Sequence, residues 1–149
     1  MSSVSERPRL TKAAVVEAAI ELADADGIDT LSMRRLADAL GYKVMSLYNH
    51  VANKDDVLAA MVDEIAVRIP RPSAGDEPMD ALRSFAIATR AQFALHRWAP
   101  TTWSSTMPGP GRVEHMETVL RLLAGSNLSA EVAHHGFHAI MSHVVGYSL

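Results

Sequence analysis

The sequence predicts an all-α fold, and three observations lead to that prediction. Apolar residues recur three or four positions apart through every long segment, which is the spacing of one helix face. The strict alternation that marks a β-strand never holds over more than a few residues. Residues that favour helix ends stand between the periodic segments. We therefore expect a three-helix domain over residues 1–54 and a second helical domain over residues 55–149, with the boundary near a helix that belongs to both.

The composition bounds the class of protein. The chain has 149 residues, 48% of them hydrophobic and 21% charged, which is usual for a globular protein. Its formal net charge of −3 argues against diffuse binding of nucleic acid but allows a local basic face. The sequence has no cysteine, no apolar run long enough to span a bilayer and no signal-peptide core. We expect a cytoplasmic protein without a membrane partner.

The N-terminal part begins with a basic segment and a helix. Residues 1–10 are either a solubilising tail or an arm that touches nucleic acid. A helix is expected over residues 12–25, with Thr11 as its N-cap. One face of this helix is apolar. The opposite face is acidic and should point away from any phosphate, and it carries Glu17, Glu21, Asp24 and Asp26.

Residues 31–54 predict a helix-turn-helix. Ser32 can cap a short helix, and Gly41 can adopt the left-handed conformation that ends it. A second helix follows at residues 44–50, with Leu47 and Val51 four residues apart as its buried anchors. Asn53 can cap the next helix. In this arrangement the second helix enters the major groove of DNA.

The same stretch carries a family resemblance. The pattern consists of Leu36-Ala37, Leu40-Gly41, Ser46-Leu47-Tyr48, His50 and Asn53-Lys54. It resembles the TetR (tetracycline-repressor-like) family of bacterial transcriptional regulators. The resemblance implies a homodimeric repressor that binds a double-stranded DNA operator and is released by a small-molecule effector. It also implies that the two reading helices of a dimer lie about one DNA turn apart, roughly 34 Å.

Nine residues are candidates for DNA contacts. The resemblance places Tyr48 and His50 against phosphate, to which a phenol and an imidazole can both donate. Arg34 can reach a base edge or a phosphate, and the alternative for Arg34 and Arg35 is a solvated helix face. Val44 and Met45 replace a polar residue and a proline of the tetracycline repressor, so the operator should differ. The full set is Arg34, Lys43, Val44, Met45, Ser46, Tyr48, Asn49, His50 and Lys54.

The second part is expected to be helical over residues 54–69, 78–96 and 112–124, and from a cap at Ser129 to the C-terminus. In the helix over residues 112–124, the inward positions are predicted to be Val113, Met116, Leu120 and Leu123. The last helix reaches Leu149 without a cap or breaker, whereas members of the resembled family continue through at least one more helix. We expect either a truncated form or a dimer that is built differently.

A small-molecule site is predicted in this second part. A mostly apolar pocket with a histidine as its polar anchor suits a ligand site, although aromatic and methionine residues at helical spacing also make ordinary core. The candidates are Trp98, Trp103, Met107, His115, Met116, Phe137 and Met141. The polar residues of a tetracycline–magnesium site have no match here, so the effector stays unidentified.

Metal binding and catalysis receive little support. His134 and His138 are four residues apart, and His135 and His138 three, which is metal-ligand spacing. Without cysteine or nearby carboxylates, these histidines are better interpreted as polar residues at a pocket mouth or dimer surface, and no metal or other cofactor is expected. No catalytic motif is present, so we do not expect an enzyme. The competing hypothesis is a helical ligand- or metal-binding module that no longer binds DNA.

Overall fold

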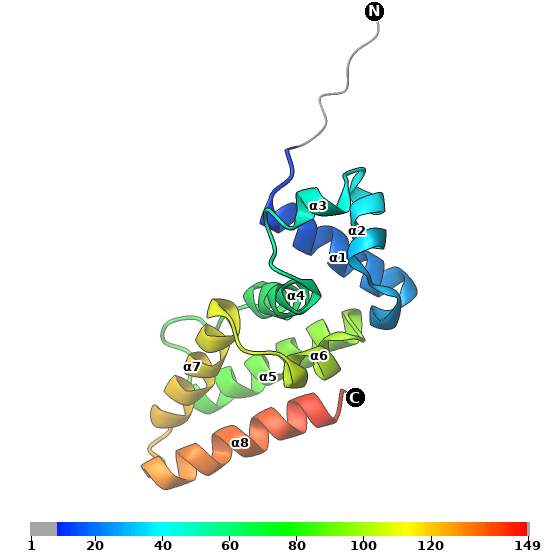
Figure 1. Ribbon diagram of the computed structural model, residues 1–149. Helices are drawn as coiled ribbons and strands as arrows, with labels where there is room; N and C mark the ends of the chain where they lie inside the picture. The colour runs from blue at the N-terminus through cyan, green and yellow to red at the C-terminus, as the bar shows by residue number, and fades with distance from the viewer. Residues whose placement is uncertain (1–8, 149) are drawn as a thin grey trace, which may run out of the picture.

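The computed structural model describes residues 9–148, which fold into eight α-helices and one 3₁₀ turn without a strand. The predicted all-α fold is confirmed. In Figure 1, α1 to α3 form one end of the molecule, α4 crosses the middle, and α5 to α8 form the other end. The elements are α1 (Lys12–Asp26), the 3₁₀ turn (Ile28–Thr30), α2 (Met33–Leu40), α3 (Val44–Leu47), α4 (Lys54–Arg68), α5 (Pro78–Leu95), α6 (Ala99–Ser105), α7 (Pro110–Ala124) and α8 (Ala130–Gly146).

The predicted helix ends are confirmed at several positions. Each of four cap side chains accepts a hydrogen bond from the amide three residues later, at distances of 2.9 to 3.3 Å: Thr11, Ser32, Asn53 and Ser129. These bonds satisfy amides that the first helical turn leaves without partners. Gly41 ends α2 with a φ of 70°, in the left-handed region.

Some predicted boundaries need correction. The helix α3 ends at Leu47 rather than at residue 50, because the amides of Asn49 and His50 bond to carbonyls only three residues back. The helix α7 begins at Pro110, two residues early, and α8 ends at Gly146. The helix α6 has no counterpart among the predicted helices. Most of the predicted N-terminal arm (residues 1–8) and Leu149 lie outside the described residues.

The buried face of α7 also differs from the prediction. Val113 and Leu120 were expected to point inward but are 44% and 41% exposed. The helix instead buries a face that includes three polar side chains, and its buried members are Gly111, Arg112, His115, Thr118, Val119 and Leu123. Polar residues are buried when they find hydrogen-bond partners, and apolar periodicity does not report such partners.

The apolar core is continuous across the two ends of the molecule. The core of α1 to α4 is completed by residues from the second part, among them Phe93, Trp98 and Val144. A second cluster between α5, α7 and α8 is built on Phe85, Val119 and Phe137 and also contains Ile69, which follows α4. The helix α4 therefore packs on both parts, and the predicted boundary between residues 54 and 55 stays a prediction. Among the described helices, none combines the length and the apolar character that crossing a membrane requires.

Candidate DNA-reading surface and effector chamber

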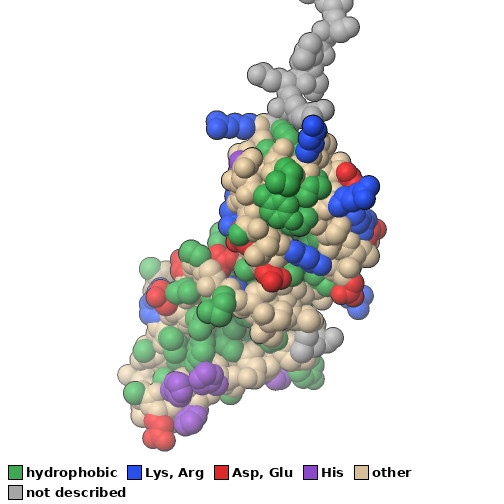
Figure 2. Space-filling view, viewed as in Figure 1, with side chains coloured by type: hydrophobic (Ala, Val, Ile, Leu, Met, Phe, Trp, Pro, Cys, Tyr) green, Lys and Arg blue, Asp and Glu red, His purple; other side chains and the backbone are tan. Residues whose placement is uncertain are grey.

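The nine candidate DNA contacts come from α2, the turn after it, α3, the turn that follows α3 and the first residue of α4, and we call them the reading surface. Leu36 and Leu47 are almost fully buried and hold α2 and α3 against the core. With Leu47 inward, Met45 and Tyr48 face solvent and are 75% and 43% exposed. Arg34, Lys43 and Asn49 are also exposed, whereas Val44, Ser46, His50 and Lys54 are half-buried. Figure 2 shows Lys and Arg side chains projecting around this end of the molecule.

The two adjacent arginines of α2 have different surroundings. Arg35 pairs with Asp26 at 2.6 Å and donates to the carbonyl oxygen of Thr30 at 3.3 Å. Arg34 is exposed and makes no ion pair with the residues that the structure describes. Its guanidinium is therefore available to a ligand, while that of Arg35 supports the fold.

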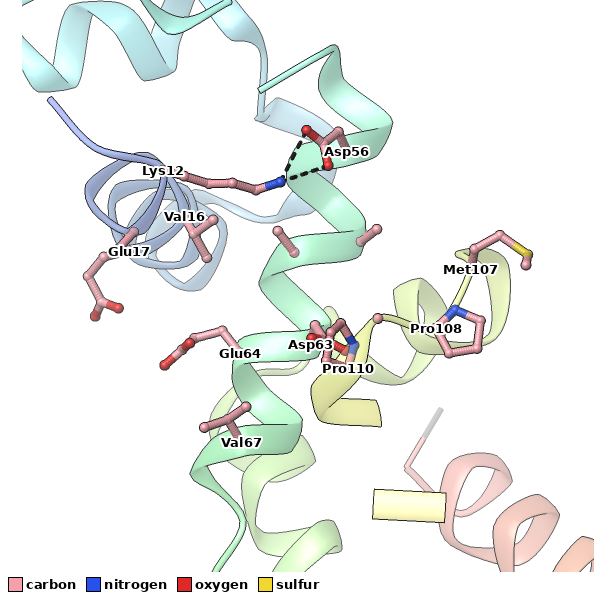
Figure 3. Close-up of a pocket in the computed structure, with 14 residues that line it drawn as sticks. Lys12, Val16, Glu17, Asp56, Asp63, Glu64, Val67, Met107, Pro108 and Pro110 are labelled. Atoms are coloured by element: carbon pink, nitrogen blue, oxygen red, sulfur yellow. Dashed lines mark hydrogen bonds and ion pairs between the residues drawn. The ribbon is translucent and has the colours of Figure 1, made fainter. Parts of the chain in front are cut away.

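The start of α4 is fixed to α1. The carboxylate of Asp56 accepts a hydrogen bond from the amide of Ala52 at 3.0 Å and pairs with Lys12 Nζ at 3.1 Å, as the dashed lines in Figure 3 show for Lys12. The Ala52 bond, assisted by Lys12, holds the pKa of Asp56 below its usual value. These contacts anchor the segment that follows α3 and so limit how α3 can move.

Two residues of the acidic face of α1, Glu17 and Asp24, contact later elements of the chain. Glu17 pairs with Arg68 of α4. Asp24 accepts a hydrogen bond from Trp98 Nε1 at 2.7 Å and lies 2.9 Å from His96 Nδ1. Trp98, a predicted ligand contact, thus lies at the contact between the two parts.

The N-terminus of α7 rests directly on α4. The carboxylate of Asp63 accepts hydrogen bonds from the amides of Gly111 and Arg112, both at 2.9 Å. A Cβ added to Gly111 would lie 2.6 Å from the carbonyl oxygen of Asp63, so only glycine allows this approach. Arg112 is 2% exposed and donates to carbonyl oxygens after α6, including that of Thr106 at 3.1 Å. Burial lowers its pKa.

His115 lies in the interior between α5 and α7. Its Nε2 is 3.0 Å from Thr89 Oγ1, and its ring centroid is 4.6 Å from that of Phe85 and 5.3 Å from that of Trp103. Burial, together with the nearby charge of Arg71, lowers the pKa of His115 to about 4. The imidazole is therefore neutral at neutral pH.

A small cavity adjoins His115, and we call it the chamber. It encloses about 10 Å³ and is lined by Leu82, Phe85, Ala86, Thr89, His115, Val119, Ile140, Met141 and Val144. This space holds at most about one water molecule. In this conformation, the chamber must expand before it can hold any molecule larger than water.

The structure brings together five of the seven predicted ligand contacts. His115 and Met141 line the chamber, Trp103 packs on the ring of His115, and Met116 and Phe137 belong to the adjoining apolar cluster. Trp98 lies apart, as described above. Met107 is 82% exposed and lies at a different hollow.

That hollow is an open groove of about 580 Å³ between α1, α4 and the segment before α7. Figure 3 shows Lys12, Glu17, Asp63, Glu64 and Met107 around it. Sequence reasoning did not find this groove or the role of Asp63, because three distant segments form it. Thr89 was also missed as a site residue, since its spacing marks only a buried position.

The histidines of α8 lie on the surface. His134 and His138 have ring centroids 4.7 Å apart, and His135 is next to them. They form the purple group near the start of α8 in Figure 2. Within residues 9–148, no group of three or more metal-ligating side chains could hold a metal ion.

Comparisons with known proteins agree with this geometry. The sequence matches the tetR family of bacterial regulatory proteins over residues 15–61 and the tetracyclin repressor-like C-terminal domain over residues 70–149. It is 39% identical over 132 residues to the HTH-type transcriptional repressor DrrR1 of Streptomyces coeruleorubidus, covering 83% of this chain and 47% of DrrR1. The chain thus spans about half the length of this curated relative.

Two solved structures share the fold. One is the TetR family protein ActR of Streptomyces coelicolor in complex with actinorhodin, with a TM-score of 0.82 and 31% identity over 94% of this chain and 68% of ActR. The other is BioQ with its double-stranded DNA operator, with a TM-score of 0.83 and 26% identity over 94% of this chain and 86% of BioQ.

Fold and site define a class of protein in which a helix-turn-helix is joined through one long helix to a helical part with an internal chamber. Within that class, the chain belongs to the tetR family of bacterial regulatory proteins.

Proposed function

We propose that this protein is a transcriptional regulator that binds an operator through its reading surface and leaves it when a small molecule occupies the chamber. The observation that carries the proposal is the exposed guanidinium of Arg34, which has no ion pair among residues 9–148, beside α3, which presents Met45 to solvent while buried Leu47 holds it in place. The DNA complex of BioQ and the actinorhodin complex of ActR support the two kinds of partner. The activity is repression in the cytoplasm, and no catalytic step is part of it.

The contacts divide by chemistry. Arg34 suits a guanine edge, which it can bond in bidentate fashion, and Tyr48 and His50 suit phosphate oxygens. Lys43, Lys54, Ser46 and Asn49 would add contacts to the DNA backbone. Met45 and Val44 suit thymine methyl groups rather than hydrogen-bonding edges.

The helix α4 offers a route between the two sites. Asp63 joins α4 to the start of α7, and His115 lies one helical turn further along α7. An effector that shifts α7 would move α4 and, through the Asp56 contacts, the segment that follows α3. By linkage, an effector that weakens DNA binding must itself bind the DNA complex more weakly by the same factor.

A homodimer completes the proposal, because a two-fold site needs two reading surfaces. Val113 and Leu120 are seven residues apart, hence on one face of α7, and both are exposed. Exposed apolar residues on one helix face suit contact with a second copy of the chain. The domain limits of 1–54 and 55–149 remain part of this proposal.

The test is selection of DNA sites from a random library by the purified protein, at near-physiological salt because phosphate contacts make affinity salt-dependent. We expect enrichment of a palindrome with half-sites about one turn apart. A folded, helical protein that enriches no sequence would contradict the proposal and favour a ligand-binding module that does not read DNA.

A further inference from the structure

The hydrogen bonds around Thr89 define which nitrogen of His115 carries the proton. Thr89 Oγ1 lies 2.9 Å from the carbonyl oxygen of Phe85, which can only accept. The hydroxyl has one hydrogen, and this bond uses it. Toward His115 Nε2, 3.0 Å away, the Thr89 oxygen must therefore accept, so Nε2 carries the hydrogen.

The other ring nitrogen is then a bare acceptor. Nδ1 of His115 is buried and has no hydrogen-bond partner among residues 9–148. A proton does not fill this position at neutral pH, because burial lowers the pKa of His115 to about 4. Buried polar atoms without partners are rare and unfavourable. A donor that reached Nδ1 would remove this cost, and His115 is one of the residues that line the chamber.

The surroundings limit what can carry that donor. The rest of the chamber is mostly apolar, with Phe85 on one side and Met141 and Ile140 from α8 on another. The charge of Arg71 acts on His115 and so also disfavours a cationic ligand there. Methionine adapts its shape easily, so the α8 side of the chamber is the side suited to expand.

We propose that the effector is an uncharged, mostly apolar molecule whose hydroxyl or N–H group donates a hydrogen bond to Nδ1 of His115. This inference rests on the proposed function, since it names the chemistry of the ligand that occupies the chamber. A single buried water at Nδ1 is the competing occupant.

The first test needs no variant. In protein labelled with ¹⁵N at histidine, the ring nitrogens of His115 at neutral pH should report a hydrogen on Nε2 and none on Nδ1. The opposite tautomer would overturn the inference, because Nδ1 would then itself be a donor.

The second test compares phenol with toluene, which has nearly the same shape and replaces the hydroxyl with a methyl group. We expect phenol to bind roughly tenfold more tightly, because toluene leaves Nδ1 unpaired. Phenol, but not toluene, should shift the ¹⁵N resonance of Nδ1. Equal binding of the two probes, binding that leaves Nδ1 unshifted, or no binding by either one would each overturn the inference.

Matched variants assign the effect to one atom. In His115→Leu, the side chain is apolar and carries no acceptor, while Thr89 keeps its bond to the carbonyl oxygen of Phe85, so the preference for phenol should vanish. His138→Leu changes an exposed histidine in the same way and should keep the preference. DNA-site selection by the unliganded protein does not depend on this bond. If these tests fail although the protein selects an operator, the proposed regulator is retained and only the proposed chemistry of the effector is rejected.

Discussion

Individual side chains at the two ends of the molecule perform different tasks, and Arg34 and Tyr48 are the clearest cases on the reading surface. Both are exposed, while the buried Leu36 and Leu47 carry the packing of α2 and α3. Changes at these positions should therefore alter binding without unfolding the protein. A variant that loses binding while it stays folded would identify a contact.

Replacing Arg34 with alanine should weaken binding to the selected operator roughly tenfold or more and relax the preference for one base pair. Tyr48→Phe should weaken binding less, and equally for all sequences, because a phosphate contact carries no sequence information. Fluorescence anisotropy with labelled duplexes measures both effects. Arg83→Ala, an exposed arginine on α5, is the control for lost charge. If both test variants bind like the parent, these contacts are wrongly assigned.

His115 makes stability depend on pH. Its pKa is lowered from 6.5 to about 4 in the folded protein, so as pH falls the unfolded chain takes up a proton before the folded one does. The free energy of unfolding should be unaffected by this group above pH 6.5. Between pH 6.5 and about 4, it should fall by up to about 1.4 kcal/mol per pH unit.

Denaturant unfolding at a series of pH values tests this dependence. The same series with His115→Gln should show a shallower loss of stability on acidification, whereas His138→Gln should follow the parent. Parallel curves for the parent and His115→Gln would show that other groups cause the acid sensitivity.

Between elements, the contact of α7 with α4 leaves no room for a side chain at Gly111. Gly111→Ala would place a methyl group 2.6 Å from the carbonyl oxygen of Asp63 and 2.8 Å from Val67 Cγ2. We expect a loss of about 1–3 kcal/mol in the free energy of unfolding, because backbone must shift to make room. Thermal or urea unfolding measures it.

The control is the same substitution in another helix. At Gly136 in α8, the added Cβ would meet Leu123 Cδ2 at 3.5 Å, an ordinary contact. Alanine there should stabilise the protein by about 0.5–1 kcal/mol, because it removes the flexibility of a mid-helix glycine. Equal effects of the two substitutions would mean that α7 can move away from α4 at little cost.

How far the sequence predicts these elements depends on where their interactions lie. Caps such as Ser32 and Asn53 act within three residues, so local spacing identified them. The buried face of α7 depends on Thr89, Trp103 and Asp63, which lie outside the helix, 9 to 49 residues from the residues that they contact. Apolar periodicity therefore predicted that Val113 is buried and did not identify Arg112 as a buried residue. The same limit explains why Asp63 was missed.

On the scale of the whole molecule, α4 is the common neighbour of both ends. It is tied to α1 through Asp56 and Lys12 and to α7 through Asp63. The second part is also joined to α1 directly, through Asp24 and Trp98. A displacement of α7 should therefore also move α4. For this reason we propose that binding of the effector can control binding of DNA.

We propose that two copies of this chain read a two-fold DNA site at a fixed separation. The most direct measurement compares affinity for the selected palindrome with affinity for the same half-sites separated by about five additional base pairs, half a helical turn. We expect a large loss of affinity, because the insertion turns one half-site to the opposite side of the duplex. Equal affinity for the two duplexes would contradict it.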